Sequence, residues 1–383
     1  MPWQTVDTME LRREFIAKWL TRRFSVLELS EAYQVSRKTL YKWIDRFEAG
    51  GTRGLCDGSH ARHSQEGRVS ESVTRSVIAL KKAHPTWGPK KLRAALDRAE
   101  PDGGWPAPST IGVLLKQAGL VKAKRRAVAR VRITPWQEAR EPNDVWAIDF
   151  KGQWRLGCGQ ECYPLTLSDT CTRYLLVCRG LPSVSGRGVR PAMEQAFRTF
   201  GLPRAIRSDW GKPFAAANHS IGLTKLSTWW LRLGINLQRI QPGRPQQNGR
   251  HERMHRTLKA ETVLPTCQSM RAQQARFDRF RQCYNHERPH EALGNRTPAD
   301  CYRSSPRPYP EKLRDFEYPG HFDLRKVRHQ GIIRLHNNDL FLSEALAHQT
   351  VGLDEDDFGW KVYFCTLPVA HIDRKNMRIT RLR

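Results

Sequence analysis

Three carboxylates stand in sequence surroundings that suit the binding of divalent metal ions. Asp149 ends the apolar run 146–148, which is expected to form a strand. An ionised carboxylate among apolar neighbours is costly unless it has a charged partner or a metal. Asp209 follows a second short strand over residues 204–208, and sites in α/β proteins assemble at strand ends. With Glu252 as a third ligand, these residues predict metal-assisted chemistry on a phosphodiester.

Glu252 lies on a helix expected over residues 250–262, directly after the loop 242–249, which is rich in Pro, Gly and Gln. Positions i, i+3, i+4 and i+7 share one face of a helix. On this helix they are Glu252, His255, Arg256 and Lys259. A carboxylate flanked by cations suits a metal ligand beside a bound phosphodiester, whereas the simpler alternative is a set of solvent-facing ion pairs. The loop before the helix favours the first interpretation.

The strands and helices expected around these three carboxylates form an α/β core over residues 144–300. Residues 163–168 and 174–178 are two further strand candidates, so an antiparallel meander is expected with Asp149 on its first strand. A helix is expected from about residue 189 to residue 200, before the strand that leads to Asp209.

The composition points to a nucleic acid partner. The 383 residues include 65 Lys and Arg against 38 Asp and Glu, a net charge of +27 that would concentrate a polyanion at the surface. Anionic lipid is the alternative, but no amphipathic helix, leader or apolar stretch of roughly 18 residues is found. No membrane association is therefore expected, and the expected location is the cytoplasm.

The cysteines predict reduced thiols rather than a disulfide scaffold or a zinc site. They number nine, an odd count, and are scattered without a repeating frame. Two partial clusters, Cys56/His60/His63 and Cys158/Cys162, do not supply four ligands at zinc-finger spacing.

A first helix-turn-helix unit is expected over residues 1–50. Ser36 is a natural N-cap for a helix over residues 37–47. In this motif the start of the second helix enters the major groove. The candidates for base and backbone contact are Arg37, Lys38, Tyr41 and Lys42, and the core-facing side chains are Leu40, Trp43, Ile44 and Phe47. The alternative is a plain helical hairpin with a solvated basic face.

A second unit of this kind is expected over residues 69–120, after a polar linker at residues 51–68. Ser109 is expected to cap its last helix, with Thr110 and Lys116 as candidate DNA contacts. This helix carries less charge than its counterpart, so a purely structural role is equally open. The basic linker 121–143 then offers phosphate contacts or a solvated tether. Its candidate contacts are Lys122, Lys124, Arg125 and Arg126.

The tail, residues 301–383, changes to short alternating apolar runs such as 332–335, 339–342 and 360–364. This pattern predicts a small β-barrel.

The core resembles the catalytic core of bacterial insertion-sequence transposases related to retroviral integrases. The motifs that carry the resemblance are residues 146–149, 207–209 and 245–252, then Lys259, and the segments 284–290 and 293–298, which close this core in bacterial transposases. The two helical units and the tail extend the resemblance over nearly the whole chain.

The resemblance implies an RNase-H-like fold with a three-carboxylate site. Asp149, Asp209 and Glu252 would hold two Mg²⁺ ions about 4 Å apart, with Mn²⁺ as a substitute. Water as nucleophile would expose a 3′-hydroxyl at an element end, and that hydroxyl would then join the end to target DNA without a covalent protein intermediate. Arg250, His255 and Lys259 would position double-stranded DNA, both terminal repeats and target. The implied state is a homo-oligomer on DNA, in association with the bacterial nucleoid.

Two departures from the family pattern stand out. The residue after the second acid is usually Asn and here is Trp210, whose indole donates one hydrogen bond but cannot accept one. The segment between Asp209 and Glu252 is longer than in retroviral integrases, and residues 224–233 are expected to form an added helix. The alternatives are therefore a decayed transposase that only binds DNA, or a metal nuclease that cuts without joining.

Overall fold

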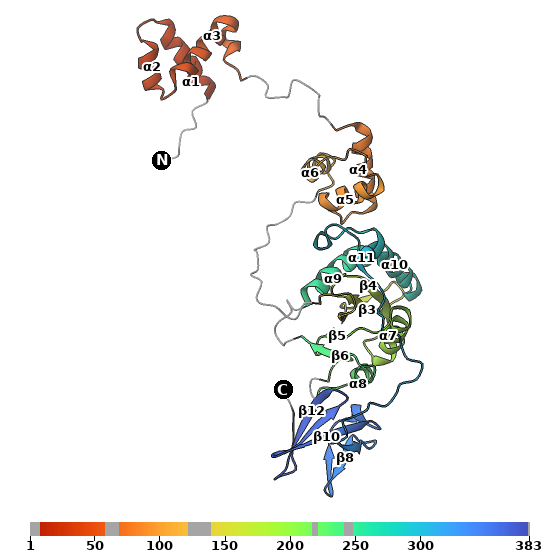
Figure 1. Cartoon of the computed structure of the whole chain (residues 1–383). Coiled ribbons are helices and arrows are strands. Elements are labelled where there is room, and N and C mark those ends of the chain that lie inside the picture. Colours follow the sequence, from red (N-terminus) through yellow and green to blue (C-terminus); the bar gives the residue numbers. More distant parts are fainter. Residues whose placement is uncertain (1–7, 58–68, 122–138, 217–220, 241–247, 382–383) are drawn as a thin grey trace. The chain divides into compact units, whose positions relative to one another are not determined.

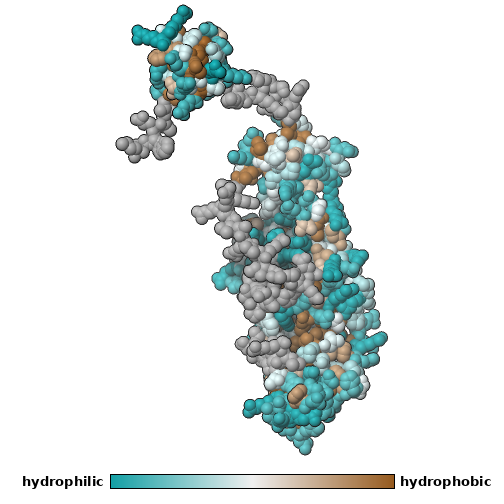
Figure 2. Space-filling view, turned by 60° about the vertical axis from the view of Figure 1, so that its left-hand side comes forward, coloured by the Kyte–Doolittle hydropathy of each residue, from teal (hydrophilic) through white to brown (hydrophobic). Residues whose placement is uncertain are grey.

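The computed structural model describes residues 8–57, 69–121, 139–216, 221–240 and 248–381. The chain divides into two compact units, residues 1–68 and residues 69–383. None of the helices within the described ranges combines the length and the apolar character that crossing a membrane requires. In the view of Figure 2, hydrophilic residues cover most of the coloured surface.

The first unit is a bundle of three helices, α1 (Thr8–Leu20), α2 (Val26–Ala32) and α3 (Arg37–Gly54) (Figure 1). Ser36 caps α3 as predicted, because its hydroxyl accepts a hydrogen bond from the Thr39 backbone amide at 3.3 Å. The helix continues past residue 50, with a kink at Gly51, whose positive φ of 59° suits glycine. Buried Leu55 completes the apolar core of this unit.

The second unit begins with three helices, α4 (Glu71–Ala83), α5 (Pro89–Ala99) and α6 (Pro108–Gln117). Their core consists of Val77, Trp87, Leu92, Leu96, Ile111 and Leu115. The prediction that Ser109 caps the last helix was wrong. The helix begins two residues earlier than predicted, at Pro108 after Ala107, because the fixed φ of proline suits the first helical position.

A mixed sheet follows, with strand order β2-β3-β1-β5-β6 and β4 paired to β3 (Figure 1). The predicted meander is present, since β1 pairs antiparallel with β3 and β3 with β4. On the other side of β1, β5 and then β6 are added in parallel. The strands are β1 (Val145–Phe150), β2 (Trp154–Arg155), β3 (Glu161–Asp169), β4 (Leu175–Leu181), β5 (Ala205–Ser208) and β6 (Asn236–Arg239).

Helices cover both faces of this sheet. One apolar cluster joins β1 and β3 to α7 (Gly186–Phe200) and α8 (Lys225–Arg232), through side chains such as Trp146 and Phe197. A second cluster joins the sheet to α9 (Gly249–Thr262) and α10 (Met270–Gln282). The chain then continues through η2 (Cys283–Glu287), η3 (Glu291–Leu293) and α11 (Pro298–Cys301). The result is an α/β sandwich in which α9 crosses the face opposite α7.

The tail forms antiparallel sheets rather than the predicted closed barrel. The larger sheet has the order β13-β12-β11-β10-β7, and its two end strands pair with no further strand in the part of the chain that is described. A separate hairpin pairs β8 with β9. The strands are β7 (Asp323–Lys326), β8 (Ile332–Leu335), β9 (Asn338–Phe341), β10 (Thr350–Asp356), β11 (Gly359–Phe364), β12 (Leu367–Asp373) and β13 (Ile379–Arg381), with η4 (Glu344–Leu346) between β9 and β10.

The added helix α8 connects the tail to the core. Ile221, Leu223 and Leu231 share one apolar cluster with the side chains of β8 to β12. The longer segment between the second and third carboxylates therefore serves as a support for the tail.

The packing of α9 predicts a large stability difference between two leucines near its end. Leu258 is fully buried, whereas Leu264 is 76% exposed. Leu258→Ala is expected to lower the free energy of unfolding by about 2–5 kcal/mol, because it leaves a cavity between α9 and the sheet. Leu264→Ala should stay within about 0.5 kcal/mol of the starting protein. Urea unfolding of the full chain measures both, and equal losses would show that α9 is not anchored as described.

Candidate active site and DNA-binding surfaces

The alternation of side chains along β1 aims Asp149 at α9. Trp146 and Ile148 pack into the cluster under α7 and α8, so the next residue points to the other face of the sheet. Asp149 pairs across the ladder with Thr166 of β3, and its side chain is 25% exposed. The carboxylate therefore lies at the floor of an accessible site.

Asp209 lies at the same level as Asp149 on the neighbouring strand. In the parallel pairing of β1 with β5, Ala147 lies opposite Arg207, and each carboxylate comes two residues later. Asp209 is exposed, and its Oδ1 accepts a hydrogen bond from the Gly211 backbone amide at 3.0 Å. A Cβ atom at Gly211 would lie 2.9 Å from Asp209 Oδ2, so a larger residue at this position would require the carboxylate to shift.

An open pocket lies between β1 and the exposed face of α9. Its lining includes the carboxylates Asp149 and Glu252 and three cations, Lys151, Arg256 and Lys259. Lys151 was not predicted as a site residue, although it stands two residues after Asp149 and thus on the same side of the extended chain. The pocket combines carboxylate oxygens, which suit a divalent cation, with cations, which suit a phosphodiester.

Burial and neighbouring negative charge shift the pKa of Asp149 strongly. Burial is the largest cause, and together with the charges of Asp209 and Glu252 it raises this pKa to about 7, against the opposing effects of the Phe150 backbone amide and Lys151. Mg²⁺ prefers hard oxygen ligands such as carboxylates, here with a negative charge that the neighbouring cations do not balance. The residues present therefore fit divalent cations.

Two buried histidines hold α9 against the sheet. His251 Nε2 and His255 Nε2 lie 2.7 and 2.6 Å from Thr166 Oγ1, and His251 Nδ1 lies 2.9 Å from Ser168 Oγ. Burial lowers the pKa of His251 to about 3 and that of His255 to about 2, so both rings are neutral near pH 7.

His255 was expected to contact DNA, but the structure places its ring under the site. It is buried, and its Nδ1 lies 3.8 Å from Asp149 Oδ2. Because the sheet takes up this side chain, the cations of the same helix face that remain at the surface are Arg256 and Lys259.

Trp210 has a structural role beside Asp209. Its indole donates a hydrogen bond to the Ile240 carbonyl at 2.8 Å, which connects the ends of β5 and β6. Nearby, the half-buried side chain of Arg239 donates to Ser208 Oγ and to the Phe214 carbonyl. Burial lowers the pKa of Arg239 to about 10, while the charge of Asp209 opposes this shift. Arg239 is a further cation near the site that was not anticipated.

The side chains of α3 divide, as predicted, into a buried core face and an exposed face. Leu40, Trp43 and Ile44 are buried, and Tyr41 is 53% exposed. The four predicted contacts lie together in one open pocket, lined by Arg37, Lys38, Tyr41, Lys42 and Asp45.

The other predicted DNA contacts lie in different surroundings. Thr110 is half-buried and Lys116 is exposed on α6. Arg250 donates to the Thr170 carbonyl at 3.2 Å, next to the start of α9. Lys122, Lys124, Arg125 and Arg126 lie outside the described residues.

Family comparisons cover both parts of the chain. Two profiles described as Integrase core domain match residues 139–245 and 233–298. A Helix-turn-helix domain profile matches residues 11–63, and a Homeodomain-like domain profile matches residues 39–115.

Individual relatives agree with these profiles. The chain is 30% identical over 237 residues to the insertion element IS407 uncharacterized 31.7 kDa protein of Burkholderia multivorans, covering 60% of this chain and 80% of that protein. It is 24% identical to the putative transposase y4bF of Sinorhizobium fredii, covering 66% and 55% respectively. The solved HTLV-2 integrase catalytic core domain in complex with magnesium shares 14% identity over 43% of this chain and 99% of that chain, with a TM-score of 0.32. The chain therefore belongs to the insertion-element transposases, which combine an integrase core domain with helix-turn-helix domains.

Proposed function

We propose that this chain cuts DNA at the ends of its element and joins the exposed ends to target DNA. The observation that carries the proposal is the convergence of Asp149, Asp209 and Glu252 from two adjacent parallel strands and one helix. Cations that can hold a phosphodiester surround the first and third of these carboxylates. The partner is double-stranded DNA, and a homo-oligomer bridges two ends.

The three carboxylates would hold two Mg²⁺ ions, with Mn²⁺ as a substitute. Bound there, the ions supply Lewis-acid activation of the attacking oxygen and stabilise the charge on the leaving oxygen. The chain itself supplies the rigid frame: β1 and β5 set the first two ligands at one level, and the buried histidines set the height of the third. Because these rings are neutral, they add no competing charge beside the ligands.

Two exchanges of phosphodiester bonds would follow in the same pocket. First, water attacks the phosphorus at the element end, and the 3′ oxygen leaves as a free hydroxyl. That hydroxyl then attacks a target phosphodiester, forming the new bond as the target's own 3′ oxygen leaves. Lys151, Arg256 and Lys259 hold the reacting phosphates, and the exposed face of α3 binds the end DNA.

Replacing the first carboxylate tests the chemistry. Asp149→Asn keeps the size of the side chain but removes its charge, and should lower Mn²⁺-dependent nicking and joining of supercoiled plasmid by about 10³-fold or more. Glu194→Gln is the matched control, because Glu194 pairs with Arg198 on the surface of α7 and should retain full activity. An inactive starting protein that Trp210→Asn activates would instead identify a decayed site that only binds DNA.

The raised pKa of Asp149 predicts that metal binding depends on pH. Below about pH 7 the carboxyl is protonated and must lose its proton to bind a cation, so affinity falls as the pH falls. Mn²⁺ titrations followed by electron paramagnetic resonance should give about tenfold weaker binding at pH 6 than at pH 8. Asp149→Asn should remove most of this dependence. Equal affinities at both pH values in the starting protein would contradict the assignment.

The α3 surface predicts a change in salt dependence. Lys42→Ala should weaken binding to duplex DNA and lower the slope of log affinity against log salt by about one, the effect of one lost phosphate contact. Lys18→Ala on α1 is the control, because Lys18 pairs with Glu14 and lies outside the α3 pocket. Fluorescence anisotropy with a labelled duplex measures both slopes. Identical slopes for the two variants would exclude α3 as the contact surface.

A further inference from the structure

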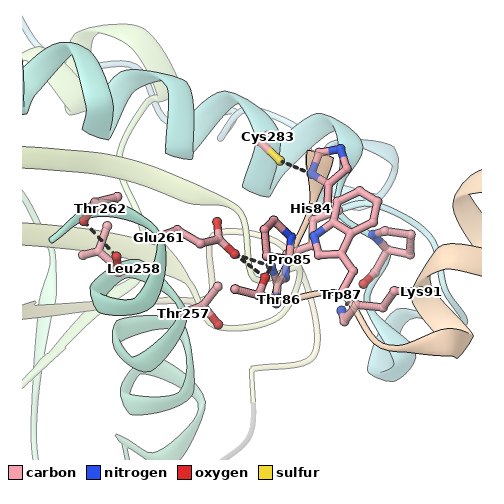
Figure 3. Close-up of polar contacts among 12 residues, drawn as sticks. His84, Pro85, Thr86, Trp87, Lys91, Thr257, Leu258, Glu261, Thr262 and Cys283 are labelled. Atoms are coloured by element: carbon pink, nitrogen blue, oxygen red, sulfur yellow. Dashed lines mark hydrogen bonds and ion pairs between the residues drawn. The ribbon is translucent and has the colours of Figure 1, made fainter. Parts of the chain in front are cut away.

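The segment that closes the core, residues 283–300, contacts the second helical domain, residues 69–121. Figure 3 shows this contact, where the loop of His84 to Trp87 meets the end of α9 and the start of η2. The proposed reaction does not involve this segment. Its contacts with the second helical domain indicate a function for it.

Glu261 stands at the centre of the contact. Its Oε1 accepts hydrogen bonds from Thr86 Oγ1 at 2.5 Å and from Arg288 Nη1 at 3.0 Å (Figure 3 shows the first). Arg288 also donates to Thr86 Oγ1 at 3.3 Å, so the three side chains close a triangle. The side chain of Arg288 is 9% exposed and that of Glu261 is 24% exposed. Removing the carboxylate would leave a largely buried guanidinium without its ion partner, a costly state.

Further contacts surround this triangle. Arg98 on α5 makes two hydrogen bonds to Asp300, at 2.6 and 2.7 Å, and the Lys91 ammonium donates to the Pro289 carbonyl. Cys283 packs against the apolar core of the helical domain. The contact therefore includes a half-buried apolar side chain as well as charged groups.

The contact with the core leaves part of α6 exposed to a possible ligand. The loop before α5, and α5 itself, provide the side chains that touch the core, whereas Val113 and Lys116 on α6 are exposed. Glu261 and Glu252 stand on the same helix, nine residues and about 14 Å apart at the usual rise of an α-helix. Anything that α6 binds is thus tied through one rigid helix to a candidate metal ligand.

We infer that Glu261 is a positioning residue, which fixes the second helical domain to the end of α9, so that DNA contacting the exposed side of α6, in addition to the DNA contact proposed for α3, is held at a set distance from the candidate catalytic carboxylates. The inference rests on the proposed function for its effect on joining. The docking itself does not depend on that function.

Hydrogen exchange in the full chain tests the docking. Glu261→Gln keeps the shape but removes the charge, and Thr86→Val removes the hydroxyl from the other side. Both should speed amide exchange over residues 84–92 by about tenfold, since local opening then no longer breaks the strong hydrogen bond from the Thr86 hydroxyl to the Glu261 carboxylate. The matched control is Glu291→Gln, which breaks the exposed pair with Lys90 in the same interface, where the side chains are 71% and 66% exposed. Exchange in α1 to α3 serves as the internal reference.

Exchange over residues 84–92 that is the same in Glu261→Gln and the starting protein would overturn the inference. So would equal acceleration by Glu291→Gln, because the effect would then belong to any charge at the interface.

Joining assays test the coupling to the site. Glu261→Gln should retain nicking of plasmid that lacks element ends to within about twofold. For a duplex that carries the element end, kcat for joining should fall by about tenfold or more, because a small misplacement of the reacting groups is costly. KM for that duplex should not change, since the DNA-contacting side chains are intact.

Parallel losses of nicking and joining would place Glu261 in folding or in the site itself, and a raised KM would make it a DNA contact. Either result overturns the positioning role. A starting protein without nicking or joining would count against the proposed function, while the exchange rates would still decide whether the docking exists.

Discussion

The burial of Asp149 beside two further carboxylates at the end of β1 is the constraint on which the rest of the core depends. Withdrawal from water is the largest cause of the rise in the pKa of Asp149, and the negative charges of Asp209 and Glu252 add to it. Such a placement persists only if the surrounding structure determines it. Here parallel pairing sets two of the acids, and the packing of α9 sets the third. A site that is strained without cations is well prepared to bind them.

The neutral histidines illustrate how polar groups under the site are accommodated. Thr166 receives both rings and also donates to the Asp149 carbonyl at 3.1 Å, so one hydroxyl connects β1, β3 and α9. A buried network of this kind is stabilising only when its members have partners, and each of these does. These hydrogen bonds fix the distance between α9 and the sheet more narrowly than an apolar contact alone would.

The parts around the core share its elements instead of adding independent ones. α8 covers the sheet and also contributes to the apolar cluster of the tail. α9 carries a candidate metal ligand near one end and contacts the second helical domain near the other. Single helices thus connect the candidate site to the attached domains, which suits the proposed function, in which DNA bound on other surfaces reaches this pocket.

Local patterns were sufficient to predict much of this arrangement. The apolar run before Asp149 predicted its strand, Ser36 predicted the start of α3, and helical spacing placed Glu252, Arg256 and Lys259 on one face. The meander was predictable because its strands lie close together in the chain, with only the two-residue β2 between β1 and β3. In each case the signal lies within one element, where side-chain period and capping chemistry act directly.

Tertiary structure alone decided the rest. The sequence placed His255 on the right helix face but not whether the sheet or the solvent would receive it, because that depends on the hydroxyl of Thr166 on a distant strand. Arg239 lies near Asp209 only because β6 pairs with β5, and β6 is too short to be evident by itself. Closure of a barrel is likewise a property of how end strands pair. The sequence by itself determined which residues could bind metal or DNA and on which helices and strands they lie. The partners of these residues were decided by contacts between distant segments of the chain, which no local periodicity encodes.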